Sequence, residues 1–419
     1  GHIAVSKNMV FVIMQNPHLN EGIFLKVLLF SWEYPPHMFG GLGQHVFDLS
    51  RFMAKQGAEI HIITPRVENY PDYQEENGVH IHRVGSSYLE GENFKSWTFR
   101  FNSDAIREAV NINSRIGGFD VIHAHDWLVA YAGRAVTKIF EIPLVTTIHA
   151  TEHGRNLGLH NRMQMEINEI EKNLALEADR VICCSQYMQD EITSLFGRPR
   201  NDIVIIPNGV DPDVFLPIPE NSRFNISEED KVIVFLGRLV PEKGVWYLLN
   251  SFPQILAEVP QARLYIGGKG PLLAELKRLT QKLGLEDNVV FTGFIYHEER
   301  NFIYHKARVA VFPSLYEPFG IVALEAMATR TPVIVGDVGG LADIVEDGVT
   351  GLKVTPANEE ELVRAITRVL NDQILADKLC NNASNMIASV YNWEVIARST
   401  IRIYEQALEQ KGKKLFNLG

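Results

Sequence analysis

Short runs of β-branched and aliphatic residues recur along the chain, separated by longer segments in which apolar residues repeat every three or four positions. The short runs favour buried strands and the periodic segments favour amphipathic helices. In the first half the predicted strands are Val27–Phe30, Glu59–Thr64, His80–Val84, Val121–His123, Leu144–Ile148, Arg180–Cys183 and Ile203–Ile206. In the second half they are Val232–Leu236, Arg263–Ile266, Val289–Phe291, Val309–Phe312, Val333–Val335 and Leu352–Val354.

Helical periodicity fills the gaps between these strands. The predicted helices are Gly43–Lys55, Ile106–Arg115, Trp127–Phe140, Met188–Leu195, Trp246–Glu258, Leu272–Leu283, Ile321–Thr329, Glu359–Asn371 and a last one from about Trp393 to Gln410. Such alternation is typical of an α/β fold in which helices cover a parallel sheet. Because substrates bind outside the carboxyl ends of these strands, two such sheets are expected to face a central cleft.

The length of 419 residues suits two domains. A segment rich in proline, aspartate and asparagine, 211–225, resembles a linker. We therefore predict one domain over 25–215 and a second over 226–390. Residues 1–24 precede the first convincing strand and form an extension of unclear role, whereas 391–419 are expected to pack back on the N-terminal domain as a helix.

Composition narrows the class of protein. The formal net charge of −11 disfavours a broad surface for nucleic acid or anionic membrane, so an anionic substrate must meet a local group of cations. The chain has three cysteines, and Cys183 and Cys184 are adjacent, which indicates no disulfide framework and favours a cytoplasmic location. No apolar run approaches the roughly 20 residues that span a bilayer.

A glycine-rich turn follows the first predicted strand and opens a helix. Gly40 and Gly41 would let backbone N–H groups approach an anionic ligand at the helix N-terminus. A dinucleotide fingerprint would need a third glycine at the position of Val46, so binding of NAD is disfavoured. A tight strand-to-helix turn without a ligand is the alternative.

Two cations follow the first strand of the second domain. Arg238 offers a planar fork to phosphate oxygens and Lys243 a point charge, so together they could bracket a diphosphate. This segment supplies the local positive charge that an acidic protein would need for an anionic substrate. Solvated surface charge is the alternative.

A further segment begins at Glu317 and continues into a predicted helix. The free N–H groups near Gly320 and Ile321 suit a phosphate. Glu325 lies in an otherwise apolar helix, where a carboxylate is costly unless it is paired or exposed, and it could accept hydrogen bonds from a ribose diol. Glu317 is expected at the mouth of the cleft.

Histidines gather at two strand ends. His123 and His125 precede Asp126, and His149 begins an H-x-x-E-H pattern that ends at His153. A zinc peptidase carries that pattern on one helix, but here it follows a strand and Gly154 interrupts it, so this function is disfavoured. Metal binding by the first pair lacks an accompanying ligand cluster.

Two other segments have a possible function and an ordinary explanation. Asp211 and Asp213 form a D-x-D pair, which could hold a divalent metal, but turn chemistry explains both aspartates as well. The aromatic-rich segment Tyr88–Phe101 is interpreted as a loop that could stack on a sugar, although packing is the simpler explanation.

Taken in order, seven motifs resemble those of the glycogen and starch synthases and their relatives among the GT-B glycosyltransferases. They are Gly40–Gly43, His123–Trp127, Thr147–His149, Asn208–Asp211, Arg238–Gly244, Glu317–Glu325 and Gly339–Asp343. The resemblance runs from Lys26 to about Tyr404 and implies two tandem Rossmann-like domains. It also implies a metal-independent, retaining transfer of a hexose from a nucleotide sugar.

The resemblance assigns a role to each candidate residue. Arg238 and Lys243 would neutralise the donor diphosphate, and Glu317 would stabilise charge on the transferred sugar. His149 would hydrogen-bond the donor sugar, and these four residues form the expected catalytic set. The remaining candidates would contact the substrates: Gly40, Gly41, Asp126, Asn208, Gly320, Ile321, Val322 and Glu325.

The expected function is α-1,4-glucan (glycogen) synthesis from UDP-glucose or ADP-glucose, with no metal or other cofactor. The partners are the nucleotide sugar and the glucan acceptor, without nucleic acid or a membrane span. Relatives in this group carry a lysine where this chain has Met38, so the donor base stays open. A retaining glucosyl- or mannosyltransferase for another polysaccharide, a glycolipid or a compatible solute is the alternative, and a glucan-binding protein without activity is another.

Overall fold

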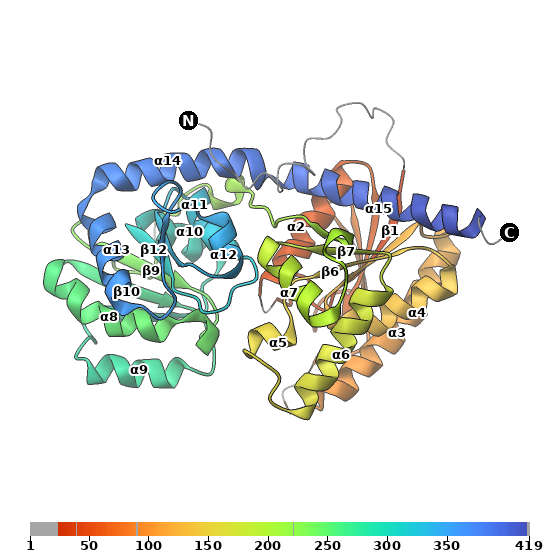
Figure 1. Cartoon of the computed structure of the whole chain (residues 1–419), viewed down its shortest axis with the longest axis horizontal. Coiled ribbons are helices and arrows are strands. Elements are labelled where there is room, and N and C mark those ends of the chain that lie inside the picture. The colour runs from red at the N-terminus through yellow and green to blue at the C-terminus, as the bar shows by residue number, and fades with distance from the viewer. Residues whose placement is uncertain (1–23, 39, 89–90, 221, 417–419) are drawn as a thin grey trace. The chain divides into compact units, whose positions relative to one another are not determined.

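The computed structural model describes residues 24–38, 40–88, 91–220 and 222–416. The chain divides into two compact units (Figure 1). The first contains the described residues up to Asn208 together with those from Trp393 onward, and the second is Gly209–Asn392. The sequence-based boundary lay a few residues further along the chain, inside the segment 211–225. The predicted extension at 1–24 falls almost wholly outside the described residues.

The first unit is built on an eight-stranded sheet in the order β3-β4-β2-β1-β5-β6-β7-β8. Its strands are β1 (Lys26–Phe30), β2 (Glu59–Pro65), β3 (Tyr73–Glu76), β4 (Val79–Val84), β5 (Val121–His125), β6 (Leu144–Ile148), β7 (Arg180–Cys183) and β8 (Ile203–Ile205). All pairs are parallel except β3 with β4, which are antiparallel. The strands predicted in this half are confirmed, and β3 is an addition.

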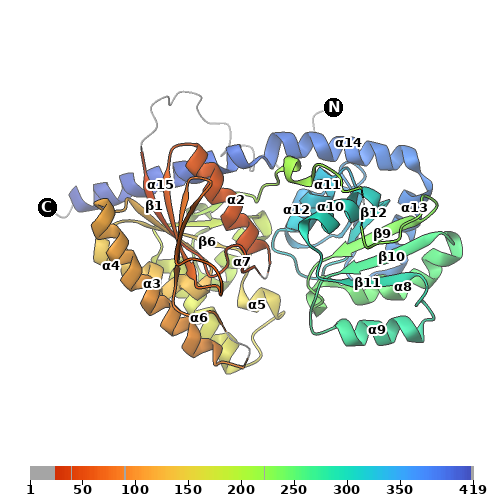
Figure 2. The same cartoon turned by 180° about the vertical axis from the view of Figure 1, so that it is seen from behind.

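Helices cover both faces of this sheet (Figures 1 and 2). They are α2 (Gly41–Lys55), α3 (Phe94–Ile116), α4 (Ala130–Phe140), α5 (Glu152–Arg155), α6 (Arg162–Glu177), α7 (Gln186–Phe196) and α15 (Trp393–Phe416). Helix α15 packs beside α2, and its Trp393, Ile396 and Tyr404 belong to the same buried core as the β1 and β2 side chains. The last helix of the chain is therefore an integral part of the first unit.

The aromatic segment Tyr88–Phe101 is not the loop that the sequence suggested. Helix α3 begins at Phe94, where Asn93 caps it by accepting a hydrogen bond from the Ser96 N–H at 3.0 Å. Within the helix, Trp97 and Phe101 are buried and their rings stack at 5.8 Å. Since both side chains serve the core, they are not available to stack on a sugar.

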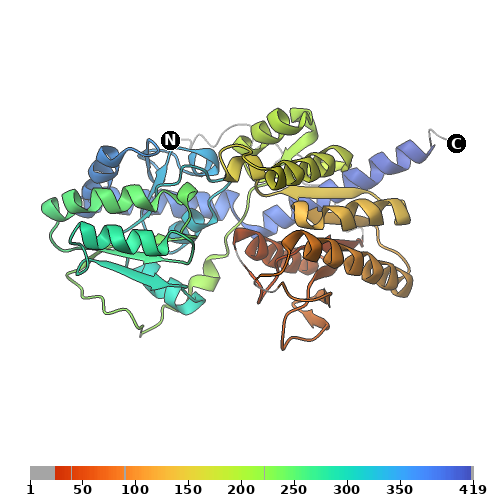
Figure 3. The same cartoon turned by 90° about the horizontal axis from the view of Figure 1, so that it is seen from below.

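The second unit is built on a six-stranded parallel sheet in the order β11-β10-β9-β12-β13-β14. Its strands are β9 (Lys231–Leu236), β10 (Ala262–Gly267), β11 (Val289–Gly293), β12 (Val309–Phe312), β13 (Val333–Gly336) and β14 (Leu352–Val354). Its helices are α8 (Val245–Glu258), α9 (Leu273–Lys282), α10 (His297–Lys306), α11 (Ile321–Ala328), α12 (Gly339–Ile344), α13 (Glu359–Asn371) and α14 (Gln373–Val390). Figure 3 shows this green and blue unit from below. The predicted strands of this half are confirmed, whereas α10, α12 and α14 were not predicted.

Strand order locates the chemistry within each unit. In the first sheet β1 lies between β2 and β5, and in the second sheet β9 lies between β10 and β12. At such a point the connections leave in opposite directions, and a crevice opens at the carboxyl ends of the strands. Candidate residues follow both strands at each point: Gly40 and Asp126 follow β1 and β5, whereas Lys243 and Glu317 follow β9 and β12.

Candidate functional site

In the second unit, the loops after β9 and β12 are joined by an ion pair. Lys243 ends the short 3₁₀ turn η4 (Pro241–Lys243), and its Nζ donates to Oε2 of the buried Glu317. Backbone bonds hold the same loops together, because the Leu315 N–H donates to the Glu242 carbonyl at 2.8 Å. Two predicted catalytic residues, Lys243 and Glu317, are therefore in direct contact.

Gly244 makes this approach of the two loops possible. Its φ of +68° lies in the left-handed region, and a Cβ added there would stand 1.9 Å from the Pro313 carbonyl oxygen. Any side chain would push the β12 loop away from η4. The glycine after Lys243 is thus explained by close backbone contact.

Two further glycines hold Glu317 from the other side. Gly339 and Gly340 begin helix α12, and added Cβ atoms would lie 2.2 Å from the Glu317 carbonyl oxygen and 2.3 Å from the Phe319 Cα. The Gly340 N–H donates to that Glu317 carbonyl at 2.8 Å. The Gly339–Asp343 motif therefore supports the loop that carries Glu317.

Helix α11 starts beside this loop. Gly320 precedes it with a φ of +98°, and Ile321 and Val322 form its first turn, with both side chains partly exposed. First-turn N–H groups have no acceptor within their own helix, so this end can accept an anion or a sugar oxygen. The three predicted backbone contacts thus come from one helix start.

Glu325 lies one turn further along α11 and is paired. Its Oε1 accepts a hydrogen bond from Arg300 on α10 at 3.0 Å, and both side chains are mostly buried. The Arg300 guanidinium also covers the Phe215 ring, with 4.7 Å from Cζ to the ring centroid. Arg300 is a partner that the sequence reading missed, since α10 was not predicted.

Arg238 is an exposed cation in the loop after β9. It follows β9 in the loop before η4, and its side chain faces solvent. Within the described part of the chain, no ion pair to Arg238 is found.

In the first unit, imidazole rings gather at the carboxyl ends of β5 and β6. His125 ends β5, His149 follows β6, and the His125 Nδ1 lies 3.0 Å from the His149 Nε2. His45 reaches the same place from α2, with its ring centroid 4.7 Å from that of His149. His123 lies one layer deeper, between the Thr147 hydroxyl at 2.7 Å and the Tyr404 hydroxyl at 2.6 Å.

Asn208 and Asp126 hold this cluster in place. The Asn208 Oδ1 is hydrogen-bonded to the His45 Nδ1, so Asn208 contacts a histidine that the sequence reading had not singled out. Asp126 accepts the His149 backbone N–H at 2.7 Å. Its φ of +62° is unusual for a residue with a side chain, and such strain is typically held at functional sites.

The surroundings of the cluster shift its ionisation. Burial, and then Arg155, lower the pKa of His149 to about 3. Burial also lowers the pKa of His45, His123 and His125 well below the usual range. For Asp126, burial outweighs Arg155 and raises the pKa to about 6. The imidazoles are therefore neutral at pH 7 and act as hydrogen-bond partners without charge.

The glycine turn after β1 already holds a carboxylate. The Glu33 Oε2 accepts the N–H groups of Gly40 and Gly43, both at 3.2 Å, and Glu33 is buried. Gly40 and Gly41 themselves are exposed. The expectation of a phosphate cradle at this turn therefore changes, because part of its N–H capacity is satisfied from within the chain.

Neither alternative metal motif forms a site. After His149, the H-x-x-E-H segment turns into the four-residue helix α5, so its two histidines do not share one long helix face. Asp211 instead caps the turn η3 (Pro212–Phe215) by accepting the Asp213 N–H at 3.1 Å. Turn chemistry thus accounts for the D-x-D pair.

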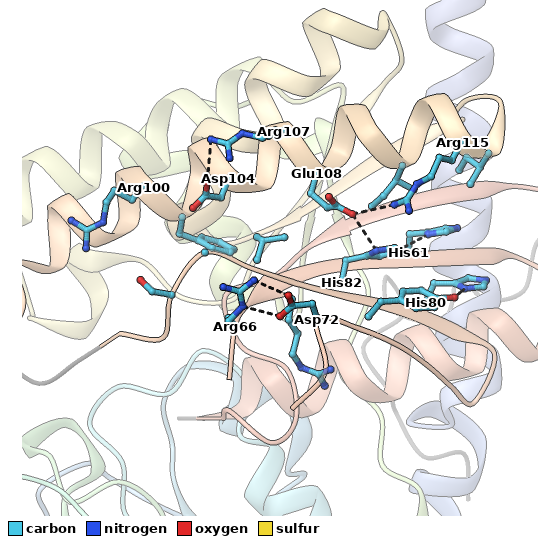
Figure 4. Close-up of a pocket in the computed structure, with 18 of the residues that line it drawn as sticks. His61, Arg66, Asp72, His80, His82, Arg100, Asp104, Arg107, Glu108 and Arg115 are labelled. Carbon is cyan, nitrogen blue, oxygen red and sulfur yellow. Dashed lines mark hydrogen bonds and ion pairs between the residues drawn. The ribbon is translucent and has the colours of Figure 1, made fainter. Parts of the chain in front are cut away.

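A separate polar cavity of about 800 Å³ lies under α3 in the first unit (Figure 4). Arginines from α3 and imidazoles from β2 and β4 line it. The labelled members are His61, Arg66, Asp72, His80, His82, Arg100, Asp104, Arg107, Glu108 and Arg115. None of the predicted site residues is among its lining residues. We find no helix in the described residues that is long and apolar enough to cross a membrane.

Comparison with known proteins identifies the family. The "Glycosyltransferase Family 4" model matches residues 39–214, and the "Glycosyl transferases group 1" model matches residues 219–386. An uncharacterized glycosyltransferase of Methanocaldococcus jannaschii is 35% identical over 396 residues, covering 93% of this chain and 100% of that protein. A glycogen synthase of Mycobacterium tuberculosis is 33% identical over 394 residues, covering 91% and 94%.

The fold agrees with this family. A solved sucrose-phosphate synthase from Thermosynechococcus elongatus superposes with a TM-score of 0.81 at 27% identity, covering 92% of this chain and 100% of that one. The chain therefore belongs to the GT-B glycosyltransferases, and its two parallel-sheet domains are those of that fold.

Proposed function

From this membership of the GT-B glycosyltransferases, we propose that the chain is a retaining α-glucan synthase. It would transfer glucose from UDP-glucose or ADP-glucose to the non-reducing end of an α-1,4-glucan. The observation that carries the proposal is the Lys243–Glu317 pair, which brings a cation and a buried carboxylate together at the switch point of the second sheet. The likeness to a glycogen synthase at 33% identity supports the choice of glucan.

The second unit would hold the donor. Arg238 and Lys243 would neutralise the diphosphate and stabilise the charge that grows on the leaving group, as preorganised cations do. The start of α11 would add backbone N–H groups, and Glu325 would accept the ribose hydroxyls while retaining Arg300 as its partner. Since the protein supplies these cations, the reaction would need no metal.

Glu317 would act as a fixed negative charge beside the sugar. Its Oε2 is engaged by Lys243, which leaves Oε1 to face the oxocarbenium-like charge of the transition state. In this arrangement the Lys243 ammonium would lie between the Glu317 carboxylate and the diphosphate. We propose front-face substitution with retained configuration, in which neither residue becomes covalently attached to glucose.

The first unit would contribute groups without charge. His149 is neutral and partly exposed, so it can hydrogen-bond a sugar hydroxyl without drawing the diphosphate toward it. Asp126 orients the His149 backbone, and Asn208 orients His45 beside it. In this assignment Asp126 and Asn208 are positioning residues that hold the imidazole cluster. The exposed part of the cluster, and not these two side chains, would contact the sugar hydroxyls.

A second function has a specific observation in its favour. The sucrose-phosphate synthase that superposes with this chain has a sugar phosphate in its name, and the identity of 27% extends over its full length. A transferase that uses a small phosphorylated acceptor would keep the donor site unchanged. The acceptor therefore separates the two functions, and the donor does not.

The test is release of nucleotide from UDP-glucose, ADP-glucose and GDP-mannose in the presence of EDTA. Each donor is offered alone, with glycogen, and with fructose 6-phosphate. Glycogen-stimulated release from a glucose donor supports the proposal and names the base. Release that only the sugar phosphate stimulates supports the second function, and turnover of GDP-mannose alone would refute both.

Lys243→Ala and Arg238→Ala provide the matched site variants, and Lys282→Ala at the last turn of α9 is a control cation of the same unit. The site variants should lower kcat/KM for the donor, whereas the control should not. Equal rates in all three would contradict the assignment of the diphosphate to the β9 loop. Stereochemistry follows from NMR of the first product, in which an α-linked glucose confirms retention.

A further inference from the structure

The histidine cluster of the first unit has a property that sugar transfer does not use. His45, His125 and His149 each offer an imidazole nitrogen, and these three nitrogens lie within 4.8 Å of one another. The rings come from three separate elements, since His45 is on α2, His125 ends β5 and His149 follows β6. The three rings therefore come together only when the chain is folded.

Two nitrogens of the cluster are unused. The Nε2 atoms of His45 and His125 are buried, and neither has a hydrogen-bond partner among the described residues. Both histidines are buried residues, at 5% and 0% exposure. A buried polar atom without a partner is costly, so such an atom is expected to serve a ligand or a bound water.

The hydrogen bonds of the cluster indicate which nitrogens carry protons. The Asn208 Oδ1 can only accept from the His45 Nδ1, so His45 carries its proton on Nδ1 and presents a lone pair on Nε2. If the His125 Nδ1–H donates to His149, the His125 Nε2 is also a lone pair. Neutral imidazole lone pairs are the groups that transition metals bind.

From these contacts we propose that His45, His125 and His149 form a binding site for a single Zn²⁺ ion. Three imidazoles and one open position give the ligand set of a tetrahedral zinc site. Asn208 would orient His45 without binding the ion, because a zinc-bound histidine commonly donates its other N–H to such an oxygen. His149 is partly exposed, which gives the ion an entry path.

Small movements would close the site. Nitrogens bound to one tetrahedral zinc lie about 3.3 Å apart, given Zn–N bonds of roughly 2.0–2.1 Å. The His125 Nδ1–His149 Nε2 hydrogen bond of 3.0 Å would open so that His149 can turn a lone pair to the ion. The three ligand nitrogens, which lie within 4.8 Å of one another, would approach by up to about 1.5 Å. The His45 ring packs edge-on against Trp393, with centroids 5.5 Å apart, and an aromatic neighbour of this kind permits a modest tilt.

Zinc would inhibit the enzyme. This consequence rests on the proposed function, in which His149 hydrogen-bonds the donor sugar. A zinc ion on His149 would fix the orientation of its ring and occupy the space beside it, so the imidazole could no longer hydrogen-bond the sugar. The site would thus make sugar transfer sensitive to free zinc without making zinc a cofactor.

The binding test needs no substrate. The full chain, freed of metal by dialysis, is titrated with Zn²⁺ against a chromophoric chelator, and X-ray absorption at the zinc edge is measured on the unaltered protein. One equivalent of zinc with about three nitrogen neighbours at roughly 2.0 Å is the expected result. A spectrum dominated by sulfur would assign the zinc to cysteines and overturn the proposal, as would no binding.

Variants locate the ion. His45→Gln and His125→Gln should each abolish the one-equivalent binding, and Asn208→Ala should weaken it about 10- to 100-fold. His153→Gln is the matched control, because His153 is adjacent in sequence to the cluster but outside it. Unchanged binding in both His45→Gln and His125→Gln, with normal melting temperatures, would refute the site.

Activity is read separately. Zinc should suppress nucleotide release in the unaltered chain, and a chelator should restore it. If zinc binds but no donor is turned over, the zinc site stands and the proposed function fails. If a donor is turned over and no zinc binds, the function stands and this inference fails.

Discussion

Acid sensitivity should arise from a second group of histidines, in the cavity under α3 (Figure 4). His61 on β2 and His82 on β4 are both buried, and the His61 Nδ1 lies 3.0 Å from the His82 Nε2. Burial first, and then His61, Arg115 and His80, lower the pKa of His82 to about 3. Burial lowers the pKa of His61 as well.

The direction in which pH changes the stability of the first unit follows from proton uptake by the folded and unfolded chains. In the unfolded chain the imidazole of His82 binds a proton near its ordinary pKa of 6.5, whereas in the folded unit it does so only near 3. The unfolded state therefore holds more protons between these values, and the stability that His82 contributes is complete above pH 6.5 and lost as the pH falls. Between pH 7 and pH 5 the loss is about 2 kcal/mol for this residue.

Groups on β2, β4 and α3 face these rings. Glu59 on β2 bonds the His61 Nε2 at 3.0 Å, and Glu108 on α3 lies 3.6 Å from the His82 Nδ1. His80 on β4 stacks on His61 with centroids 4.4 Å apart, and Arg115 on α3 pairs with Glu108. Because Glu59 favours the charged imidazole of His61, the contribution of His61 has the same sign as that of His82 and is partly offset.

The assay uses the tryptophans. Four of the five lie in the first unit, at positions 32, 97, 127 and 393, so Trp246→Phe leaves fluorescence that reports this unit alone. In that background, the free energy of unfolding in urea is measured at pH 7 and pH 5 for the parent and for His82→Gln. The loss between the two pH values should be about 2 kcal/mol smaller in the variant.

The control is Tyr73→Phe. It removes the Tyr73 hydroxyl bond to the His80 Nδ1 at 2.9 Å from the same group of rings but keeps every imidazole. Its pH dependence should match that of the parent even if its stability is lower. Parallel losses in His82→Gln and the parent, within about 0.5 kcal/mol, would refute the reasoning.

Four substitutions test the donor loops and the histidine cluster, and Gly284→Ala is a control. Gly244→Ala should destabilise the second unit by about 3 kcal/mol or more, whereas Gly284→Ala, with a similar φ of +67° and open space around it, should cost about 1 kcal/mol; thermal unfolding compares the two. Lys243→Ala should reduce kcat/KM by a factor equivalent to about 2–4 kcal/mol in steady-state kinetics, and a loss below threefold would show that Lys243 does not contact the diphosphate. Glu317→Gln and His149→Ala should each lower kcat by orders of magnitude with unchanged circular dichroism, and near-normal turnover would remove either residue from the mechanism.

The strands were predictable because each is a short apolar run that periodicity detects directly. The sequence analysis missed one strand and several helices, among them the long helices α6 and α14. Strand β3 has the sequence Tyr-Gln-Glu-Glu and lies at the sheet edge, where polar residues are tolerated. Helix α10 is weakly amphipathic and rich in charged residues, yet it buries Phe302, Ile303 and Tyr304. Tertiary packing formed these elements, and local pattern could not reveal it.

The site was predictable only where motifs follow strands. Lys243 and Glu317 were selected separately from their motifs, and the structure pairs them. His45 and Arg300 were missed because each lies inside a helix, in a sequence context that shows nothing unusual. Their importance comes from contacts with Asn208 and Glu325, which are far away in the sequence. Such partners become visible only when the fold brings the elements together.

Under the proposed function an acidic chain would bind an anionic donor, and the charges of the two units make this possible. Burial keeps the imidazoles of the histidine cluster in the first unit neutral, so they can hydrogen-bond hydroxyl groups without adding a charge to the site. In the second unit, Arg238 faces solvent and Lys243 is held beside Glu317. Under the proposed function, a diphosphate needs only these local cations, since charges more than about 10 Å away are largely screened by salt. The net charge of −11 is then compatible with a nucleotide-sugar donor, because the distant carboxylates scarcely influence its binding.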